Sequence, residues 1–355
     1  MKAIKEIKVG NKLIGYNQPC FIIGEAGVNH NGRLDLAKKL VDAAAKAGVD
    51  AVKFQFFKSE KVVTEKAEMA EYQKENLQSN ESQVEMLKKL ELNEENHKIL
   101  KDYAGKKGLI FLSTPHSGNE AVDALEKMDM AAYKLGSGDL TNKPFLEHVA
   151  KTNKPIFLST GMATMEEAKK AISWIRNAGN DKVIVLHCTS NYPCPYDEVN
   201  MNAMKSMMQE LDCLVGYSDH TMGTEIPVLA RAMGACLVEK HFTLDKNMEG
   251  PDHKASADPK ELKFIVDSIR NLEKAFGWSE KKPNKSEIEI MKGLRKSVVA
   301  EGDIKKGKRI DPTDLFIKRP GTGIQPEEYD QVIGKKSKVD IKKDTLIKYS
   351  DLEKA

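Results

Sequence analysis

Short apolar runs recur along the chain, and each ends in polar or charged residues. Stretches with helical periodicity separate most of these runs; residues 34–48 (LDLAKKLVDAAAKAG) are one example. Strands that alternate with helices predict parallel pairing with right-handed crossovers. Eight runs therefore predict an α/β protein with a (β/α)8 TIM barrel, whose active site lies where the strands end. The runs cover residues 21–27, 50–55, 109–114, 131–138, 155–160, 182–190, 213–220 and 235–242.

The pattern changes after the eighth run, and it predicts two domains. Residues 1–278 form the barrel domain, which closes with a helix at 258–277. Residues 279–293 are polar and charged, as is typical of a linker. Residues 294–355 hold short β-like pieces broken by Gly and Pro, without an amphipathic helix of full length. We expect a small β-rich domain there.

One crossover is unusually long. Residues 58–83, between the second and third runs, are far more polar than a barrel helix needs. An insertion that follows a barrel strand lies on the catalytic face and often acts as a lid or substrate loop. We expect this segment to lie over the active site.

Composition narrows the class of protein. The chain has 355 residues, of which 40% are hydrophobic, enough for a substantial core. It has no apolar stretch as long as a membrane span, and its start lacks the apolar core of a signal peptide. We therefore expect a soluble, cytoplasmic protein. The formal charge of +3 gives nucleic-acid binding no general support, and five cysteines without a CxxC pair indicate buried, reduced thiols.

Strand periodicity identifies the side chains that enter the barrel mouth. Lys53 shares one face of its run with Gln55, and the neighbouring apolar residues take the other face. By the same parity, His220 and His241 end the seventh and eighth runs, which are neighbouring strands, so their rings can converge. Lys240 has the opposite parity and should face outward into a salt bridge.

Two histidines at adjacent strand ends are candidate ligands of a divalent metal, with Glu239, water or substrate oxygens completing the site. A hydrogen-bonded pair of structural histidines remains an alternative, because two ligands without a third are a weak signal.

The other strand-end residues suit an anion. Lysines that point into a barrel need an anionic partner, and hydroxyls and glycine amides beside them favour a phosphate. The candidates are Lys53, Lys134, Ser113, Thr114, Ser137, Ser159, Thr160, Ser190 and Ser218. Glu25 ends the first run and could either act on a water or hydroxyl or pair with a lysine. Asp252, in the loop after the eighth run, could hold substrate hydroxyls or be a turn residue.

The sequence stretches that contain these candidate residues resemble the sialic acid synthase family, which includes N-acetylneuraminate, legionaminic acid and pseudaminic acid synthases. The order and spacing agree along the whole chain. Residues 318–324 (KRPGTGI) are similar to the antifreeze-protein-like (SAF) domain that ends these enzymes. Matching stretches include EAGVNHNG (25–32), AVKFQFFK (51–58), YKLGSGDLTN (133–142), LHCTSNYPCP (186–195), GYSDHTMG (216–223), EKHFTLDK (239–246) and GPDHKAS (250–256).

The resemblance implies that phosphoenolpyruvate condenses with an open-chain N-acetylated amino sugar to give a nine-carbon α-keto acid and phosphate. The sugar would be N-acetylmannosamine or a 2,4-diacetamido-2,4,6-trideoxyhexose. The resemblance assigns Mn²⁺ or Mg²⁺ to His220 and His241, and it implies a domain-swapped homodimer in which Arg319 reaches the sugar's acetamido group in the partner. It assigns phosphoenolpyruvate to Lys53, Thr114, Lys134, Ser137, Ser159, Ser190 and Ser218, and the sugar and reacting carbons to Glu25, Gln55, Tyr192 and Asp252.

Three positions depart from the family pattern, and two other functions compete. Some members have Asn at the position of Ser190, many have Phe at His116, and Glu is common at Asp139. A Schiff-base aldolase would use Lys134 or Lys53 as a nucleophile. A non-catalytic carbohydrate-binding or ice-binding protein would have no need of the two histidines.

Overall fold

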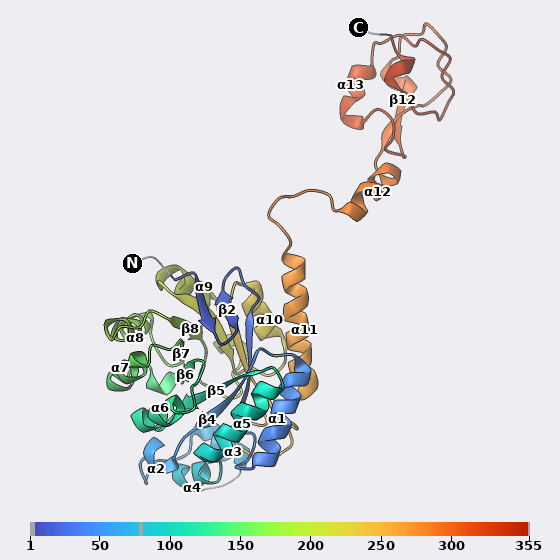
Figure 1. Ribbon diagram of the computed structural model, residues 1–355. Helices are drawn as coiled ribbons and strands as arrows, with labels where there is room; N and C mark the ends of the chain where they lie inside the picture. The colour runs from blue at the N-terminus through green and yellow to red at the C-terminus, as the bar shows by residue number, and fades with distance from the viewer. Residues whose placement is uncertain (1–3, 78–80, 354–355) are drawn as a thin grey trace. The chain divides into compact units, whose positions relative to one another are not determined.

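Figure 1 shows the computed structural model of the chain, in which residues 4–77 and 81–353 are described. The chain divides into two compact units, Met1–Phe276 and Gly277–Ala355. The first unit contains the candidate active site.

The first unit is the predicted (β/α)8 barrel. All pairs of neighbouring strands are parallel, in the order β5-β4-β3-β10-β9-β8-β7-β6. The strands at the two ends of this order, β5 and β6, also contact each other, which closes the ring. The strands are β3 (Phe21–Gly27), β4 (Ala51–Phe56), β5 (Ile110–Pro115), β6 (Tyr133–Leu135), β7 (Ile156–Ser159), β8 (Val183–His187), β9 (Leu214–Asp219) and β10 (Leu237–His241).

Helices surround this barrel, as Figure 1 shows. In α1 the apolar residues Leu36, Leu40 and Ala44 recur every four positions and are buried, and the helix ends at Gly48 in a left-handed conformation. Thr164 and Glu167 form a capping box at the start of α8. The helices are α1 (Leu34–Ala47), α5 (Glu94–Lys106), α6 (Gly118–Glu126), α7 (Lys143–Lys151), α8 (Met165–Asn177), α9 (Met201–Glu210), α10 (Glu225–Ala232) and α11 (Pro259–Phe276), with short 3-10 turns η1 (Ser137–Asp139) and η2 (Tyr196–Glu198).

An N-terminal hairpin, which the sequence analysis did not predict, precedes the barrel. It consists of β1 (Glu6–Val9) and β2 (Lys12–Gly15), which pair antiparallel. Ile7, Val9 and Ile14 are buried in the same apolar cluster as Phe21 and Phe157 from the barrel strands. Because each strand has only four residues, its alternating pattern was too short to stand out.

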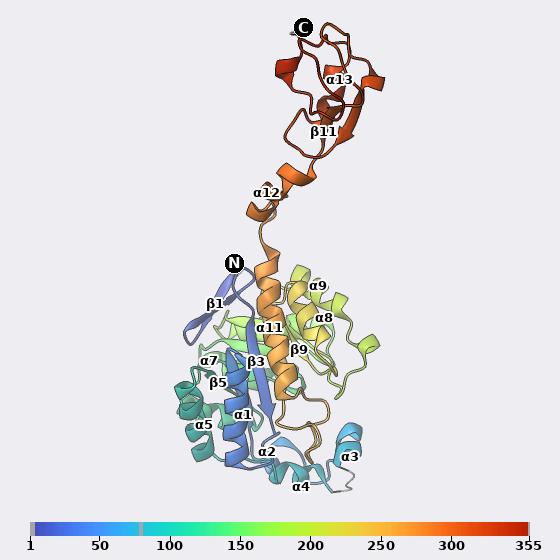
Figure 2. The same cartoon turned by 90° about the vertical axis from the view of Figure 1, so that its right-hand side faces the viewer.

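The long insertion after β4 forms three short helices, α2 (Ser59–Val62), α3 (Glu71–Leu77) and α4 (Gln83–Lys88). Its apolar residues, such as Met86, pack in a small separate cluster that also includes Phe57 and, from the loop after β3, Val28. In Figure 2 the arrow of β3 points towards these helices. The insertion therefore lies at the carboxyl ends of the strands, the face where the sequence places the active site.

The second unit has its own core, formed by residues such as Val298, Ile310 and Ile347. Strands β11 (Ser297–Ala300) and β12 (Leu315–Lys318) pair antiparallel. A ten-residue helix, α12 (Lys285–Leu294), occupies most of the segment interpreted as a linker; none of its residues is buried. Charged residues dominate the segment as a whole, and Ile288, Ile290 and Leu294 of the helix stay exposed, so no buried face marks it. The remaining elements are η3 (Pro312–Asp314), η4 (Pro326–Glu328), α13 (Tyr329–Val332) and η5 (Tyr349–Asp351).

Among the described residues, no helix combines the length and the apolar character needed to cross a bilayer. All five cysteines are buried and free, as the sequence indicated.

Candidate active site

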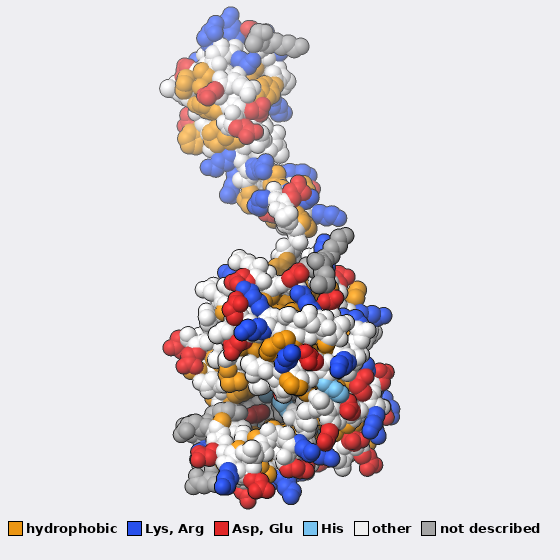
Figure 3. Space-filling view, turned by 90° about the vertical axis from the view of Figure 1, so that its left-hand side faces the viewer, with side chains coloured by type: hydrophobic (Ala, Val, Ile, Leu, Met, Phe, Trp, Pro, Cys, Tyr) orange, Lys and Arg blue, Asp and Glu red, His pale blue; other side chains and the backbone are white. Residues whose placement is uncertain are grey.

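A cavity of about 260 Å³ opens at the carboxyl ends of the strands. The space-filling view of Figure 3 shows a hollow in the surface of the barrel unit, with pale-blue histidine atoms visible in it. Thirteen of the fourteen residues that the family resemblance assigns to the site line this cavity; Arg319, an exposed residue of the second unit, is the fourteenth. Ser113 and Thr160, also named as candidates for an anion site, do not line it. The thirteen are Glu25, Lys53, Gln55, Thr114, Lys134, Ser137, Ser159, Ser190, Tyr192, Ser218, His220, His241 and Asp252.

An apolar floor isolates the bottom of the cavity from water. Ile23 and Ala51 belong to the buried cluster inside the barrel, and Glu25 and Lys53 follow them two residues later on the same strands. Since side chains two apart share a face, the charged pair lies directly above the apolar layer. Low polarity below strengthens the electrostatic interactions above it.

Two buried carboxylates hold the two buried lysines. Lys53 Nζ lies 2.8 Å from Glu25 Oε1 and donates to Thr114 Oγ1 at 3.0 Å. Lys134 Nζ lies 3.1 Å from Glu239 Oε1, and Glu239 Oε2 is 3.9 Å from Lys53 Nζ. Of the two roles left open for Glu25, the structure therefore contains the pairing with a lysine. Gln55 Nε2 also donates to Glu25, at 3.2 Å.

The carboxylates differ in protonation although they share these partners. Burial raises the pKa of Glu25, against the effect of Lys53. Burial also acts to raise the pKa of Glu239, but Lys134 and Lys53 outweigh it and hold that pKa below its ordinary value. Burial acts to lower the pKa of Lys134, but Glu239 opposes it, and the resulting pKa is raised. Glu239 is thus a fixed anion, Lys134 is a fixed cation, and Glu25 is the group able to exchange a proton near neutral pH.

Hydroxyls line the wall beside the lysines. Ser218 donates to Glu239 Oε1 at 3.0 Å, and the buried Ser159 Oγ has no hydrogen-bond partner. The backbone of Gly161 approaches two further hydroxyls, because a Cβ there would lie 2.2 Å from Ser190 Oγ and 2.8 Å from Ser137 Oγ. An unpaired donor, two cations and a close backbone approach together make a pocket suited to an anion such as phosphate.

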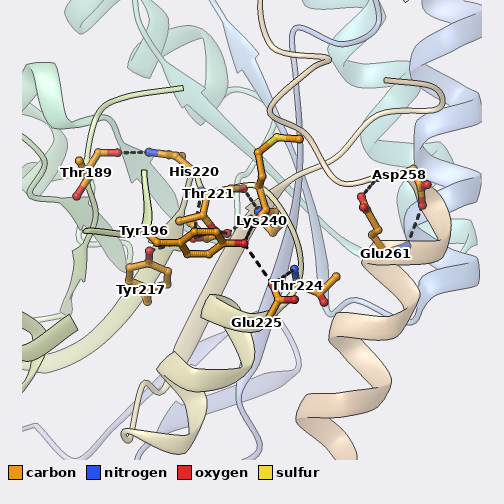
Figure 4. Close-up of polar contacts among 12 residues, drawn as sticks. Thr189, Tyr196, Tyr217, His220, Thr221, Thr224, Glu225, Lys240, Asp258 and Glu261 are labelled. Atoms are coloured by element: carbon orange, nitrogen blue, oxygen red, sulfur yellow. Dashed lines mark hydrogen bonds and ion pairs between the residues drawn. The ribbon is translucent and has the colours of Figure 1, made fainter. Parts of the chain in front are cut away.

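His220 and His241 converge as their parity predicted. Their ring centroids lie 5.4 Å apart, and the ring of Tyr192 lies 4.0 Å from that of His220. Figure 4 shows His220 turned towards Thr189, whose carbonyl oxygen lies 2.5 Å from His220 Nδ1. This bond assigns the Nδ1 proton and leaves Nε2 as the free nitrogen of His220.

Both rings can serve as metal ligands. Burial lowers the pKa of His220 to about 4, and burial together with His220 lowers the pKa of His241. The rings are therefore neutral, the form that binds a metal. His241 Nδ1 is buried without a hydrogen-bond partner, and Asp252 Oδ2 is 3.8 Å away. This orphaned nitrogen, beside a second neutral imidazole, fits a divalent cation.

The chain itself supplies few further ligands. Within residues 4–77 and 81–353, no group of three or more His, Cys, Asp or Glu is arranged to hold a metal. Glu239, suggested as a further ligand, has its oxygens near Lys134, Ser218 and Lys53. Water and substrate oxygens are the other ligands that the sequence suggested.

The loop after β10 contributes Asp252 but not its neighbour. Asp252 lines the cavity, and burial raises its pKa to about 6. His253 instead lies 2.6 Å from Thr243 Oγ1 and 3.1 Å from Asn31 Oδ1, so it holds the loop against the end of β3. Asp252 is therefore more than a turn residue.

One wall of the cavity is apolar and was not predicted from the sequence. We define the apolar wall as Val28, Met86, Leu87, Leu90 and Pro251. Three of these residues come from α4 and the turn after it. Their spacing could have indicated an inward face just after the polar segment 58–83. His116, at the end of β5, also lines the cavity, and burial lowers its pKa to about 3.

Comparison with known proteins identifies the family to which the chain belongs. The NeuB family matches residues 40–281, and the SAF domain matches residues 295–353. The chain belongs to the NeuB family. It is an enzyme, a synthase of the sialic-acid type with a C-terminal SAF domain, as the sequence motifs indicated.

Three relatives make the likeness specific. The N,N'-diacetyllegionaminic acid synthase of Legionella pneumophila is 44% identical over 97% of this chain and 98% of its own length. The enzyme of the same name from Campylobacter jejuni is 47% identical over 92% of this chain and 98% of its own. The crystal structure of the N-acetylneuraminic acid synthetase of Leptospira borgpetersenii is 35% identical and superimposes with a TM-score of 0.71, covering 81% of this chain and 95% of that one.

Proposed function

We propose that the protein condenses phosphoenolpyruvate with a 2,4-diacetamido-2,4,6-trideoxyhexose to give an N,N'-diacetyllegionaminic acid-type product and inorganic phosphate. The observation that carries this proposal is the meeting of Lys53, Lys134, His220 and His241 in one cavity. The cations suit a phosphorylated enol, and the histidines suit a metal beside it. Sequence identities of 44% and 47% to two enzymes named for that product support the choice of sugar.

The apolar wall also supports this sugar. A 6-deoxy sugar ends in a methyl group, and each acetamido group adds another. N-acetylmannosamine would instead present hydroxyls to that wall, where they would lose hydration without gaining a partner. We therefore expect the diacetamido sugar to be preferred over N-acetylmannosamine.

Phosphoenolpyruvate would lie over the two lysines. Lys53 and Lys134 would bind its phosphate and carboxylate, with Thr114, Ser137, Ser159, Ser190 and Ser218 donating to the oxygens. The unpaired Ser159 hydroxyl is a ready donor. By holding the enol in one orientation, these residues would convert a bimolecular encounter into a positioned reaction.

His220 and His241 would hold the divalent cation, Mn²⁺ or Mg²⁺. Such an ion, when bound, acts as a Lewis acid that polarises a carbonyl oxygen. The residues of the chain itself would do the rest: Tyr192 and Asp252 would border the sugar, and Gln55 would keep Glu25 oriented.

The bond changes define a role for Glu25. C3 of the enol attacks the aldehyde carbon, water adds at C2, and phosphate leaves with cleavage of the C–O bond. The water must lose a proton as it adds. Glu25, whose pKa burial raises, is placed beside Lys53 to accept that proton and to return it later.

The Schiff-base alternative fits the cavity less well. A nucleophilic lysine needs a lowered pKa, whereas Glu239 raises the pKa of Lys134, and Lys53 lies 2.8 Å from Glu25. Borohydride treatment in the presence of pyruvate should therefore leave the protein unlabelled.

The proposal is tested by phosphate release from phosphoenolpyruvate with Mn²⁺ and a panel of sugars. We expect release that depends on the sugar and is fastest with the 2,4-diacetamido-6-deoxy compound. Faster turnover of N-acetylmannosamine would contradict the choice of sugar. Absence of release with every sugar would contradict the function.

A further inference from the structure

A buried ion pair lies directly behind the two histidines. Lys240 Nζ is 2.5 Å from Asp219 Oδ2, and the two side chains are 1% and 0% exposed. Neither residue lines the cavity, and the mechanism above gives neither a role. Lys240 has the outward, salt-bridged orientation that its parity predicted.

The register of β9 and β10 explains the position of this pair. Glu239 pairs with Ser218, and Lys240 pairs with Asp219. Since successive side chains on a strand point to opposite faces, Glu239 and Ser218 meet inside the cavity, whereas Lys240 and Asp219 meet behind it. The next residue in each case, His220 just after β9 and His241 at the end of β10, is a histidine that again faces the cavity. The ion pair is thus one residue before both candidate metal ligands.

The same ammonium also binds the chain beyond His220. Lys240 Nζ donates to the carbonyl oxygen of Thr221 at 2.5 Å. Both neighbours of His220, Asp219 and Thr221, are therefore attached to one nitrogen, and Lys240 itself is covalently next to His241. Figure 4 shows Lys240 in contact with this segment, while the ring of His220 points away towards Thr189.

Asp219 extends the connection to the side chains around it. Its Oδ1 accepts from Tyr217 Oη at 2.9 Å and from the Thr221 amide at 3.3 Å, and Thr221 Oγ1 donates to both carboxylate oxygens at 3.0 Å. Each charge in the pair is therefore satisfied by several partners, as a buried ion pair requires. Such a network has one well-defined geometry.

His241 depends on this network more than His220 does. A carbonyl oxygen holds the ring of His220 through Nδ1, but Nδ1 of His241 has no hydrogen-bond partner. Its position must therefore come from the strand that carries it and from what packs behind it.

A buried ion pair is a poor way to gain stability, since an apolar pair of similar volume often does as well. We propose that the Lys240–Asp219 pair is a positioning device that sets the separation of His220 and His241 for a divalent cation. This inference rests on the proposed metal-dependent function. Metal sites tolerate only small errors in ligand position, and loss of an outer partner typically lowers metal affinity about 10- to 100-fold.

The test uses the full-length protein and Mn²⁺ alone, with free Mn²⁺ followed by its electron paramagnetic resonance signal. Lys240→Met would leave Asp219 as an unpaired buried charge, so the informative variant is Lys240→Met/Asp219→Asn, which removes both charges. Glu273→Gln is the matched control. It removes one charge from the ion pair between Glu273 on α11 and Arg231 on α10, and neither residue lines the cavity. Thermal unfolding of each variant measures the loss of stability separately.

We expect the double variant to raise the Mn²⁺ dissociation constant at least about tenfold. The KM for phosphoenolpyruvate should change less than about twofold, because Lys53 and Lys134 pair with other groups. Glu273→Gln should leave Mn²⁺ binding unchanged, even if its unfolding temperature falls as far as that of the double variant. Lys240→Arg, which keeps the charge, should recover part of the affinity.

Two results would overturn the inference in different ways. If the double variant binds Mn²⁺ as the wild type does, or no worse than Glu273→Gln does, the pair is structural and only this inference fails. If the wild-type protein binds no Mn²⁺, the assignment of a metal to the two histidines fails, and the positioning role fails with it.

Discussion

Lys53 and Glu25 form an ion pair inside the barrel, with 2.8 Å between Nζ and Oε1, and both side chains are almost completely buried. The pair joins a lysine proposed to bind phosphoenolpyruvate to the carboxylate proposed to move a proton. A substrate anion that bound Lys53 would weaken its hold on Glu25. The proposed function therefore links substrate binding to the basicity of Glu25 through one contact.

Replacement of Lys53 by Gln should raise the KM for phosphoenolpyruvate about 10- to 100-fold, because a charge-assisted hydrogen bond to a phosphorylated ligand is lost. Steady-state kinetics with saturating sugar measure the change. Lys12→Gln is the control, since Lys12 also pairs with a carboxylate, Asp50, but does not line the cavity. An unchanged KM for Lys53→Gln would remove Lys53 from the phosphoenolpyruvate site.

A methyl group at position 161 should disturb the same substrate without removing a charge. In Gly161→Ala, the new Cβ would meet Ser190 Oγ at 2.2 Å and Ser137 Oγ at 2.8 Å, so at least one hydroxyl must move. We expect a raised KM for phosphoenolpyruvate and a smaller effect on the KM for the sugar. Gly105→Ala, where a Cβ meets nothing within 4 Å, should leave both constants unchanged. Equal kinetics for the two variants would show that Ser137 and Ser190 do not bind this substrate.

The free energy of unfolding should fall as the pH is lowered, and part of this loss should come from His97. Burial lowers the pKa of His97 to about 4, between the rings of Phe56 and Phe111. An unfolded histidine has a pKa of about 6.5. At pH values between about 6.5 and 4, His97 therefore binds a proton in the unfolded chain but not in the folded one, so acid favours unfolding. From pH 7.5 to 5.5 the free energy of unfolding should fall by about 1.3 kcal/mol more in the wild type than in His97→Gln. Urea unfolding at both pH values measures this, and parallel losses in the two proteins would refute it.

Arg319 tests the role proposed for the second unit. Arg319→Ala should weaken use of the sugar far more than use of phosphoenolpyruvate, because the family resemblance assigns this arginine to an acetamido group. Mixing Arg319→Ala with an inactive His241→Ala variant should restore part of the activity if one subunit completes the site of another. Equal effects on both substrates would contradict the contact between Arg319 and the sugar. No restoration on mixing would contradict the completion of one subunit's site by another.

The sequence predicted the barrel and most of the cavity because both depend on strand periodicity. Once each run was recognised, parity placed Lys53 beside Gln55 and turned Lys240 away from the cavity. These local rules cannot supply partners from distant elements. The pairing of Lys134 with Glu239, for example, depends on how β6 and β10 face each other across a closed ring.

The features missed from the sequence are those with weak local patterns. Strands β1 and β2 are too short to show alternation, and α12 has no buried face. The apolar wall was hidden because Leu87 and Leu90 follow directly on the long polar segment 58–83. Only the folded insertion brings them to Val28 and Pro251 around one cavity.

The central claim is that a carbon–carbon bond forms while phosphate leaves by C–O cleavage. Phosphoenolpyruvate that carries ¹⁸O in the oxygen bridging C2 and phosphorus tests this directly, with Mn²⁺ and the 2,4-diacetamido sugar present. We expect the label in inorganic phosphate, released in equal amount with the nine-carbon acid. Label retained in the keto acid, or phosphate released without the sugar, would contradict the account.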